Sequence, residues 1–220
     1  MPKRRKAPEF PRRIVIEGPI GVGKTTFAEA LAERAAARLV LEEVEENPFL
    51  KRFYAEPEEA AFQTQLFFLL SRFRQQQTLL QEDLFQRTTV ADYLFEKDRI
   101  FATLNLRQDE LALYGRIYEL LDTRIPPPDL VVFLQARTDV LMDRVRMRNR
   151  PWERGITEAY LEKISAAYAD FFFHWTRSPL LIVNTSDIDF VEREQDLEDL
   201  IGTVRRMKKG TQVYNPLSRS

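Results

Sequence analysis

The stretch from Gly18 to Thr25, GPIGVGKT, constrains the fold of this chain more than any other. It matches the pattern G-x-x-x-x-G-K-[ST], in which a glycine-rich loop joins a strand to a helix and binds phosphate groups. A short apolar run, residues 13–17, precedes the loop, and apolar residues recur at helical spacing from Phe27 to Ala35. The segment therefore predicts a strand, a tight loop and a helix.

The residue types of this loop suit a nucleoside triphosphate. Glycines let backbone N–H groups converge on phosphate oxygens, and the N-terminus of the next helix adds a partial positive charge. Lys24 is expected to reach the β- and γ-phosphates, and the Thr25 hydroxyl to ligate Mg²⁺. A glycine-rich turn without a ligand is the alternative, which the flanking strand and helix disfavour. The predicted contact residues are Gly18, Pro19, Ile20, Gly21, Val22, Gly23, Lys24, Thr25 and Thr26.

Length and composition exclude several other kinds of protein. The 220 residues suit one α/β domain, which we expect over 13–207, with a disordered basic tail at 1–12 and a C-terminal tail at 208–220. A net charge of −1 argues against nucleic-acid binding. The absence of Cys and the single His174 exclude disulfides, thiolate nucleophiles and Cys- or His-based zinc sites. No apolar run approaches the ~20 residues of a membrane span, so we expect a cytoplasmic protein without membrane contact.

Five short apolar runs read as strands, at 13–17, 38–42, 88–92, 130–134 and 180–184, with long helical patterns between them. This alternation predicts an α/β fold with a five-stranded parallel sheet and helices on both faces. Ligands of such sheets bind beyond the carboxyl ends of the strands. The residues just past each strand are therefore the candidates for chemistry.

Acidic residues stand at two of these strand ends. Glu42 and Glu43 follow the second strand, where a carboxylate can accept a proton from an attacking hydroxyl or hold a metal ion. A solvated loop acid explains their position equally well. Asp92 ends the third strand, where such enzymes carry an acid that supports the metal, so Thr25 and Asp92 form the predicted Mg²⁺ site.

A long helical pattern over 57–86 carries Gln65 and Arg72 seven residues apart, so the two side chains share one side of the helix. Gln offers a donor and an acceptor together, which suits the edge of a base, although either residue alone is more often a surface residue. Asp98 begins the next helical segment.

Four arginines alternate in the stretch Arg144-Val-Arg-Met-Arg-Asn-Arg150. Guanidinium groups downstream of a phosphate-binding loop suit a lid, about 144–155, that closes over phosphates and offsets charge in the transition state. A charged solvent face is the alternative. The aromatic cluster at 171–175 is better explained as core or subunit contact than as a cofactor site.

By these features the chain resembles the deoxynucleoside kinase family, from about residue 13 to 200. The family phosphorylates the 5′-hydroxyl of deoxyribonucleosides. The resemblance rests on the phosphate loop, on Glu42-Glu43-Val44 where the family has Glu-Pro-Val, and on the run from Gln65 to Arg74. It implies that Glu42 is the catalytic base.

The resemblance also implies roles for residues that pattern alone leaves open. The loop 184–187 resembles the one that holds adenine mainly by backbone. The implied contacts to the deoxynucleoside come from Glu42, Tyr54, Gln65, Arg72, Asp98 and Glu153, those to the transferring phosphate from Lys24, Arg144, Arg148 and Arg150, and those near adenine from Asp187.

The chain departs from the family pattern after the third strand. Eukaryotic members carry Glu-Arg there, and here the counterpart is either Asp92-Tyr93 or, in another register, Gln86-Arg87. We prefer Asp92, because 88–91 reads as strand, and this choice leaves the family's Arg without a counterpart. Glu43 in place of Pro is a smaller departure. The motifs look most like bacterial deoxyadenosine/deoxyguanosine kinases, so a purine is the expected base.

The predicted function is ATP- and Mg²⁺-dependent phosphorylation of a deoxyribonucleoside in nucleotide salvage. Two alternatives remain: a nucleoside monophosphate kinase such as thymidylate kinase, and a nucleotide-binding subunit without catalysis. Apolar helices between 104 and 122 suit the helix bundle of a homodimer, as in the family.

Overall fold

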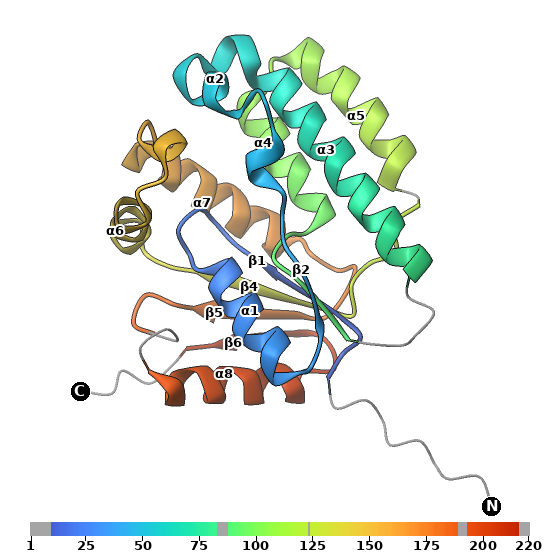
Figure 1. The fold of residues 1–220 in the computed structure, drawn as a ribbon, viewed down its shortest axis with the longest axis vertical. Coiled ribbons are helices and arrows are strands. Elements are labelled where there is room, and N and C mark those ends of the chain that lie inside the picture. The colour runs from blue at the N-terminus through green and yellow to red at the C-terminus, as the bar shows by residue number, and fades with distance from the viewer. Residues whose placement is uncertain (1–9, 83–87, 123, 189–192, 216–220) are drawn as a thin grey trace, which may run out of the picture.

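The computed structural model describes residues 10–82, 88–122, 124–188 and 193–215. A parallel sheet of six strands, in the order β2-β3-β1-β4-β5-β6, lies between helical layers (Figure 1). The α/β class and the parallel sheet are confirmed. The strands are β1 (Arg13–Glu17), β2 (Arg38–Val40), β3 (Thr89–Ala91), β4 (Leu130–Gln135), β5 (Leu180–Asn184) and β6 (Thr211–Tyr214).

The central strands form because their residues are apolar on both faces, as a sheet covered by helices on both sides requires. In β1 and β4, Ile14, Ile16, Val131 and Val132 are all fully or almost fully buried. The parallel pairing of β1 with β3 and β4 aligns the carboxyl ends of these strands at one edge. The phosphate loop and Asp92 therefore leave the sheet at the same edge.

The prediction of five strands is wrong, because β6 adds a sixth within the segment expected to be the C-terminal tail. It pairs in parallel with β5 alone, at the rim of the sheet. Its residues are mostly exposed, and Val213 is 61% exposed. Such a strand needs no buried apolar run, so the sequence pattern gives no indication of it.

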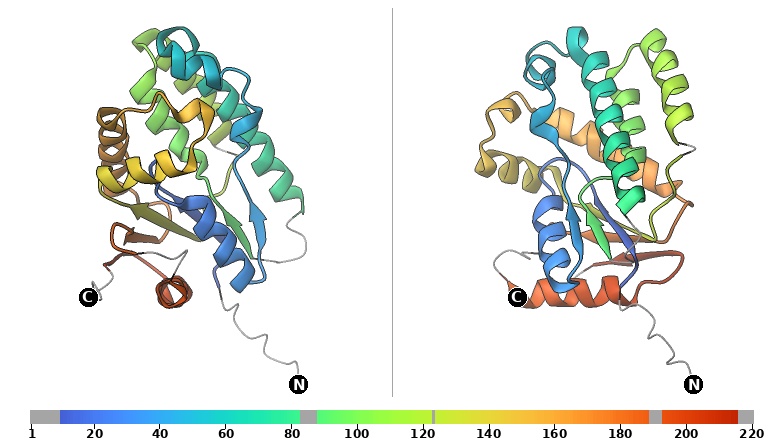
Figure 2. Two further views of the ribbon diagram at one scale, coloured as in Figure 1. Left: turned by 60° about the vertical axis from the view of Figure 1, so that its left-hand side comes forward. Right: turned by 45° about the vertical axis from the view of Figure 1, so that its right-hand side comes forward.

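Helices cover both faces of the sheet (Figures 1 and 2). One core cluster joins the sheet to α1, α6 and α8, and another joins it to α4 and α7. α3 and α5 pack on α4, farther from the sheet. The helices are α1 (Lys24–Arg34), α2 (Leu50–Ala55), α3 (Pro57–Glu82), α4 (Asp98–Asn105), α5 (Gln108–Asp122), α6 (Thr138–Arg148), α7 (Glu158–Phe173) and α8 (Glu194–Arg206).

One predicted helix ends earlier than its pattern, and the predicted lid is only partly helical. The pattern over 57–86 is α3, which is helical to Glu82, and residues 83–86 lie outside the described part of the chain. The arginine stretch begins on α6, which ends where Asn149 adopts a left-handed conformation with φ 47°. Arg144 and Arg148 thus share a helix, while Arg150 lies beyond its end.

The aromatic cluster at 171–175 is split between core and surface. Phe172 and Trp175 are buried against the sheet, as predicted for core residues, whereas Phe173 and His174 are exposed. Within the described ranges, no helix has the length and apolar character needed to cross a membrane.

Candidate active site

The phosphate loop connects β1 to α1, and its glycines fit where side chains do not. Gly21 has φ 84°, and a Cβ there would lie 2.7 Å from the Leu141 carbonyl oxygen. At Gly18 a Cβ would lie 2.2 Å from the Leu134 carbonyl oxygen. The loop therefore packs directly on the backbone of β4 and α6, which only glycine permits.

Lys24 lies across its own loop. Its Nζ donates to the carbonyl oxygens of Gly18, at 2.8 Å, and Pro19, at 3.2 Å. Burial lowers the pKa of Lys24 to about 8, although the nearby Glu17 carboxylate opposes this effect. An anion that enters the loop would favour the charged ammonium and offer it a stronger partner than these neutral carbonyls.

A cavity of about 1220 Å³ opens beside this loop, at the carboxyl ends of the strands. It brings together most of the residues that the sequence singles out. Gly18 and Pro19, in the phosphate loop, and Asp98 do not line it. The predicted residues that do are Ile20, Gly21, Val22, Gly23, Lys24, Thr25, Thr26, Glu42, Tyr54, Gln65, Arg72, Asp92, Arg144, Arg148, Arg150, Glu153 and Asp187.

Glu42 is the most heavily engaged acid of this cavity. Arg72 donates to its Oε1 from two nitrogens, Nε at 2.9 Å and Nη2, and Lys97 Nζ donates to Oε2 at 2.7 Å. Burial alone would raise the pKa of Glu42, but the two cations outweigh it and hold this pKa at about 2. Glu42 is therefore an ionised, oriented carboxylate.

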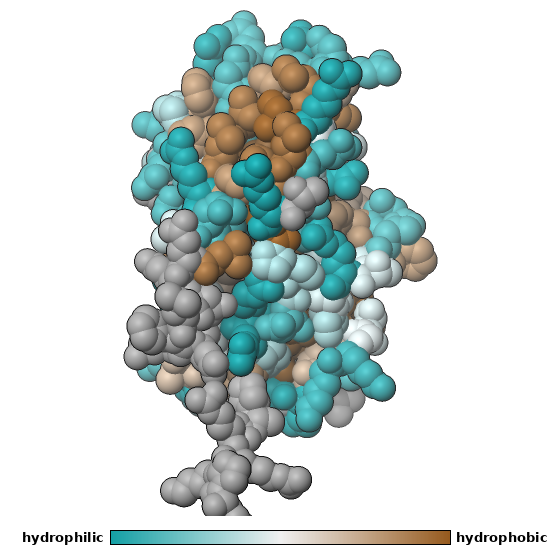
Figure 3. All heavy atoms as spheres, turned by 90° about the vertical axis from the view of Figure 1, so that its right-hand side faces the viewer, coloured by the Kyte–Doolittle hydropathy of each residue, from teal (hydrophilic) through white to brown (hydrophobic). Residues whose placement is uncertain are grey.

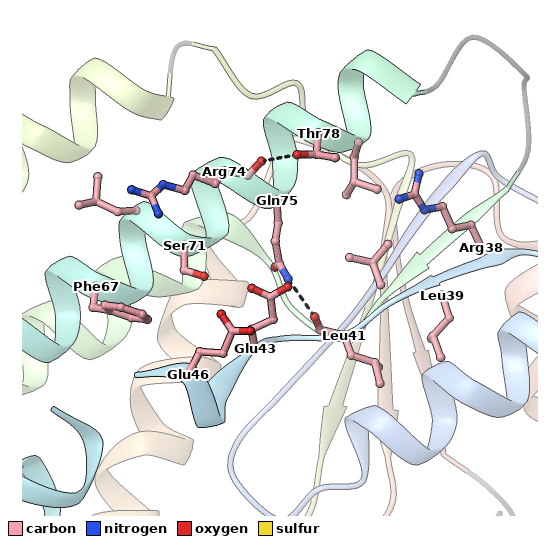
Figure 4. A pocket seen from close by; sticks show the side chains of 13 residues that line it. Arg38, Leu39, Leu41, Glu43, Glu46, Phe67, Ser71, Arg74, Gln75 and Thr78 are labelled. Carbon is pink, nitrogen blue, oxygen red and sulfur yellow. Dashed lines mark hydrogen bonds between the residues drawn. The ribbon is translucent and has the colours of Figure 1, made fainter. Parts of the chain in front are cut away.

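The adjacent Glu43 takes a different environment, which separates two residues that sequence position leaves equivalent. Its side chain is exposed and borders both the large cavity and a smaller one of about 550 Å³ between β2 and α3 (Figure 4). There Gln75 of α3 donates to the Leu41 carbonyl oxygen at 3.3 Å. Among the described residues, Arg72 and Lys97 pair with Glu42, whereas the Glu43 side chain is exposed.

Asp92 links the two strand ends. Its Oδ2 accepts a 2.6 Å hydrogen bond from the Thr25 hydroxyl, and its Oδ1 accepts a 2.7 Å bond from the backbone N–H of Glu42. Tyr93 is buried, does not line the large cavity, and accepts a hydrogen bond from Gln76. The other register, Gln86-Arg87, lies outside the described residues.

The hydroxyl and carboxylate oxygens of Thr25 and Asp92 fit Mg²⁺, a hard cation that prefers oxygen ligands. Among the described residues, no group of three or more His, Cys, Asp or Glu side chains forms a metal cage. This donor set suits an ion that keeps water and takes its remaining ligands from phosphates.

Asp98 lies behind the cavity wall. It is fully buried on α4, and Arg72 Nη1 donates to its Oδ1. The guanidinium of Arg72 thus bridges Asp98 and Glu42, which ties α3 to the loop after β2 and to the first residue of α4. Asp98 holds Arg72 in place and does not itself face the cavity.

Gln65 and Tyr54 line the end of the cavity formed by α2 and α3. Gln65 is only 3% exposed, and its side-chain amide has no hydrogen bond within the described residues. Tyr54 is half-buried, and burial raises the pKa of its phenol, so its hydroxyl stays protonated. Donor and acceptor groups therefore face this end of the cavity.

The lid residues form two different sets of contacts. Arg148 on α6 donates to both carboxylate oxygens of Glu153, from Nε at 3.1 Å and Nη2 at 2.6 Å. Arg144 bonds to the Thr185 carbonyl oxygen at 2.9 Å and to the Thr185 hydroxyl at 3.2 Å, which ties α6 to the loop after β5. In that loop, Asp187 accepts a hydrogen bond from Arg137 at 3.3 Å.

Sequence reasoning missed two buried charged residues near the loop. Glu17, at the end of β1, is fully buried and accepts hydrogen bonds from the Gly18 and Leu94 backbones and from the Tyr168 hydroxyl. Lys97 is 3% exposed, lines the large cavity and bonds to Glu42. A lysine or glutamate beside an apolar segment is the only indication that the sequence offers.

Comparison with known proteins gives a consistent result. Residues 14–208 match the family model for deoxynucleoside kinase. The chain is 35% identical to a deoxyguanosine kinase of Bacillus subtilis, over 88% of this chain and 96% of that one. It is 31% identical to a deoxyadenosine kinase of Dictyostelium discoideum, over 92% and 83% respectively.

Comparison with solved structures finds proteins of the same kind. The fold resembles that of deoxyadenosine kinase from M. mycoides with bound dATP, with a TM-score of 0.76 at 24% identity, over 87% of this chain and 98% of that one. The chain therefore belongs to the deoxynucleoside kinase family, whose members are phosphotransferases.

Proposed function

We propose that this protein transfers the γ-phosphoryl group of ATP to the 5′-hydroxyl of a purine deoxyribonucleoside. One observation supports the proposal: a single cavity joins the phosphate loop to an ionised Glu42 and to Gln65, a buried amide without a hydrogen bond to the other described residues. Donor, acceptor and base reader can thus be engaged together.

In this reaction the acceptor oxygen forms a bond to the γ-phosphorus, and the bond to the β,γ-bridging oxygen breaks. Glu42 accepts the hydroxyl proton. A carboxylate with a pKa of about 2 is a weak base, but proton transfer comes late in a loose transition state, so orientation of the hydroxyl matters most. Arg72 and Lys97 fix that orientation by hydrogen bonds to both carboxylate oxygens.

Cations and backbone amides bind the phosphates of the donor, ATP. Lys24 and the N-terminus of α1 bind the phosphates, and Thr25 with Asp92 would hold the Mg²⁺ that offsets their charge. Arg144, Arg148 and Arg150 supply the lid, and the loop after β5, with Asp187, lies by the adenine. Arg148 and Glu153 line the same cavity as the phosphate loop. When the lid closes, Arg148 would exchange its hydrogen bonds to Glu153 for bonds to a phosphate.

The deoxynucleoside occupies the end of the cavity formed by α2 and α3, away from the phosphate loop. Tyr54 and Glu153 hold the sugar, and Gln65 pairs with the base edge. Arg72 lies between base and acceptor hydroxyl, and Asp98 acts through it by holding the guanidinium. The names of the relatives support a purine, since the Bacillus subtilis and Dictyostelium discoideum proteins are a deoxyguanosine and a deoxyadenosine kinase.

An acceptor screen tests this proposal. The purified protein with ATP and Mg²⁺ is given each of the four deoxynucleosides, and thymidine monophosphate as a fifth acceptor, and the phosphorylated product is identified by mass. We expect deoxyguanosine or deoxyadenosine to give the highest kcat/KM. Faster phosphorylation of thymidine monophosphate would instead identify a monophosphate kinase, and ATP binding without any product would identify a nucleotide-binding subunit.

We also propose a homodimer formed through the helical layer. Leu113 and Leu120 lie two turns apart on α5 and are 51% and 71% exposed, and Leu104 of α4 is also exposed. Figure 3 shows hydrophobic side chains gathered on the upper part of the face where α5 lies. An apolar stripe on a helix is suited to pairing with the same stripe of a second copy.

A further inference from the structure

Lys97 is the buried cation of the cavity that neither sequence pattern nor resemblance assigns. It lies between β3 and α4, at the end of a short 3₁₀ turn, Phe95–Lys97. A lysine at 3% exposure carries a desolvation cost that a purely apolar residue would avoid. Its position therefore needs an explanation beyond packing.

The ammonium of Lys97 is only partly used by the protein. Among the described residues its Nζ makes one hydrogen bond, to Glu42 Oε2 at 2.7 Å, while Glu17 lies at 3.9 Å, beyond hydrogen-bond distance. A lysine has three N–H donors. Arg72 is different, because its Nε and both Nη groups are engaged by Glu42 and Asp98.

The bond to Glu42 also fixes how far Lys97 lies from the reacting atoms. An acceptor hydroxyl that gives its proton to Glu42 must lie about 2.6–3.2 Å from a carboxylate oxygen. Two atoms that bond to the same carboxylate are then only a few ångströms apart, within about 6 Å if they share one oxygen. Because the lysine stem is flexible, rotation about its bonds would let the ammonium reach a phosphoryl group bonded to that hydroxyl oxygen.

A second cation faces the same space. Lys24 lines the cavity from the phosphate loop, and the charge of Lys97 is among the causes that lower the pKa of Lys24. The carboxylates of Glu17, Glu42 and Asp92 offset part of the repulsion between the two ammonium groups, and a further anion in the cavity would offset more. The transferring phosphoryl group is an anion that passes through this region.

We propose that Lys97 is a second phosphate-binding cation of the site, which contacts the phosphoryl group during transfer and the 5′-phosphate of the product. This rests on the proposed function, because it places the acceptor at Glu42. The sequence has Tyr93 where the resemblance to eukaryotic members leads one to expect an arginine, and Tyr93 is buried away from the cavity. Lys97 supplies a cation that Tyr93 cannot. Lys24 then holds the donor side and Lys97 the acceptor side.

The first test uses binding without turnover. Dissociation constants for the preferred deoxynucleoside and for its 5′-monophosphate are measured by calorimetry in the absence of ATP. Loss of a charged hydrogen bond to the phosphate in Lys97→Met should weaken binding of the monophosphate about 10- to 100-fold. The dissociation constant for the deoxynucleoside itself should change less than about threefold, because only the phosphate is contacted.

Two further variants separate charge from structure. Lys97→Arg keeps a cation and should restore most of the monophosphate affinity, whereas Lys163→Met removes an exposed lysine of α7 and should change neither constant. If Lys97→Met does not fold, judged by circular dichroism, Lys97→Gln replaces it. Equal losses for both ligands, or no loss for the monophosphate, would overturn the proposal.

Turnover distinguishes this proposal from that for Glu42. Lys97→Met should lower kcat about 10²- to 10³-fold, as removal of a transition-state donor does elsewhere. Glu42→Gln is assayed in parallel. If Glu42→Gln keeps its turnover while Lys97→Met loses both turnover and monophosphate affinity, Glu42 is not the general base. The phosphate-binding role of Lys97 is then still supported. A near-normal kcat for Lys97→Met overturns the role of Lys97 alone.

Discussion

The hydroxyl of Thr25 donates a 2.6 Å hydrogen bond to Asp92, which joins the helix after the phosphate loop to the end of β3. The second oxygen of this carboxylate holds the backbone N–H of Glu42. In the proposed function, Asp92 would therefore serve both the metal and the residue that activates the acceptor. A short aspartate suits this position, because the Thr25 hydroxyl and the Glu42 N–H both lie within hydrogen-bond distance of its carboxylate.

Asp92→Asn should lower turnover at least about 10²-fold, because a neutral amide interacts with the proposed Mg²⁺ several kcal/mol less favourably than a carboxylate does. The Mg²⁺ concentration for half-maximal rate should rise as well. The measurement is the initial rate over a Mg²⁺ titration. Asp170→Asn, at an exposed site on α7, is the control, and a Mg²⁺ dependence unchanged by Asp92→Asn would contradict the metal assignment.

Glu42→Gln should lower kcat about 10²- to 10⁴-fold, which is the usual contribution of a general base. The matched control is Glu43→Gln, which changes the adjacent but exposed carboxylate and should leave kcat within about threefold, since surface changes rarely matter more. Steady-state rates for both variants decide the point. Equal losses would show that the charge of the loop matters more than the position of Glu42.

Gln65→Leu should raise KM for the preferred purine deoxynucleoside at least about tenfold and reduce discrimination between bases. The reason is that Gln65 is the buried amide without a protein hydrogen bond among the described residues of the cavity wall. Gln63→Leu, on an exposed side of α3, is the control. The comparison is kcat/KM for all four deoxynucleosides, and an unchanged ranking would exclude Gln65 as base reader.

Leu113→Glu combined with Leu120→Glu should convert a dimer to a monomer, because two charges would be buried in the proposed interface. Light scattering after size-exclusion chromatography gives the mass. Phe173→Glu changes an apolar side chain that is 84% exposed on α7, and it should leave the mass unaltered. A wild-type mass of about 26 kDa would exclude the homodimer.

Local pattern predicts the parts of this molecule that local chemistry decides. The glycine pattern predicts the phosphate loop, and short apolar runs predict the strands β1 and β5. The place of Asp92 after an apolar run predicts that it lies at the edge of the sheet. The sixth strand is not predicted, because exposed residues 211–214 become a strand only by pairing with β5. The interior of the site also depends on contacts between distant segments.

Arg72 and Lys97 illustrate this second limit. Arg72 shares a helix side with Gln65, and the sequence pattern shows no more than that. Its guanidinium is bound by Glu42 and Asp98, 30 and 26 positions away in the chain. The role proposed for Lys97 arises only because the fold brings it to Glu42, 55 positions earlier. Neither ion pair leaves a periodic trace in the sequence.

Glu96 offers a prediction about stability that is separate from catalysis. It is buried beside the half-exposed Arg177, and burial raises the pKa of its carboxyl despite that cation. A carboxyl with a higher pKa in the folded state makes folding less favourable as pH rises from the unfolded value through the folded one. Glu96→Gln removes this term, so its stability relative to wild type should increase with pH and level off once Glu96 is ionised.

Urea unfolding at pH values from 4 to 8 measures this difference in the free energy of unfolding. At the acid end both proteins carry a neutral side chain here, and their stabilities should converge. Glu119→Gln, an exposed change on α5, gives the baseline for loss of a surface charge. If the advantage of Glu96→Gln instead shrank as pH rose, Arg177 would outweigh burial, and Glu96 would be a stabilising ion-pair partner.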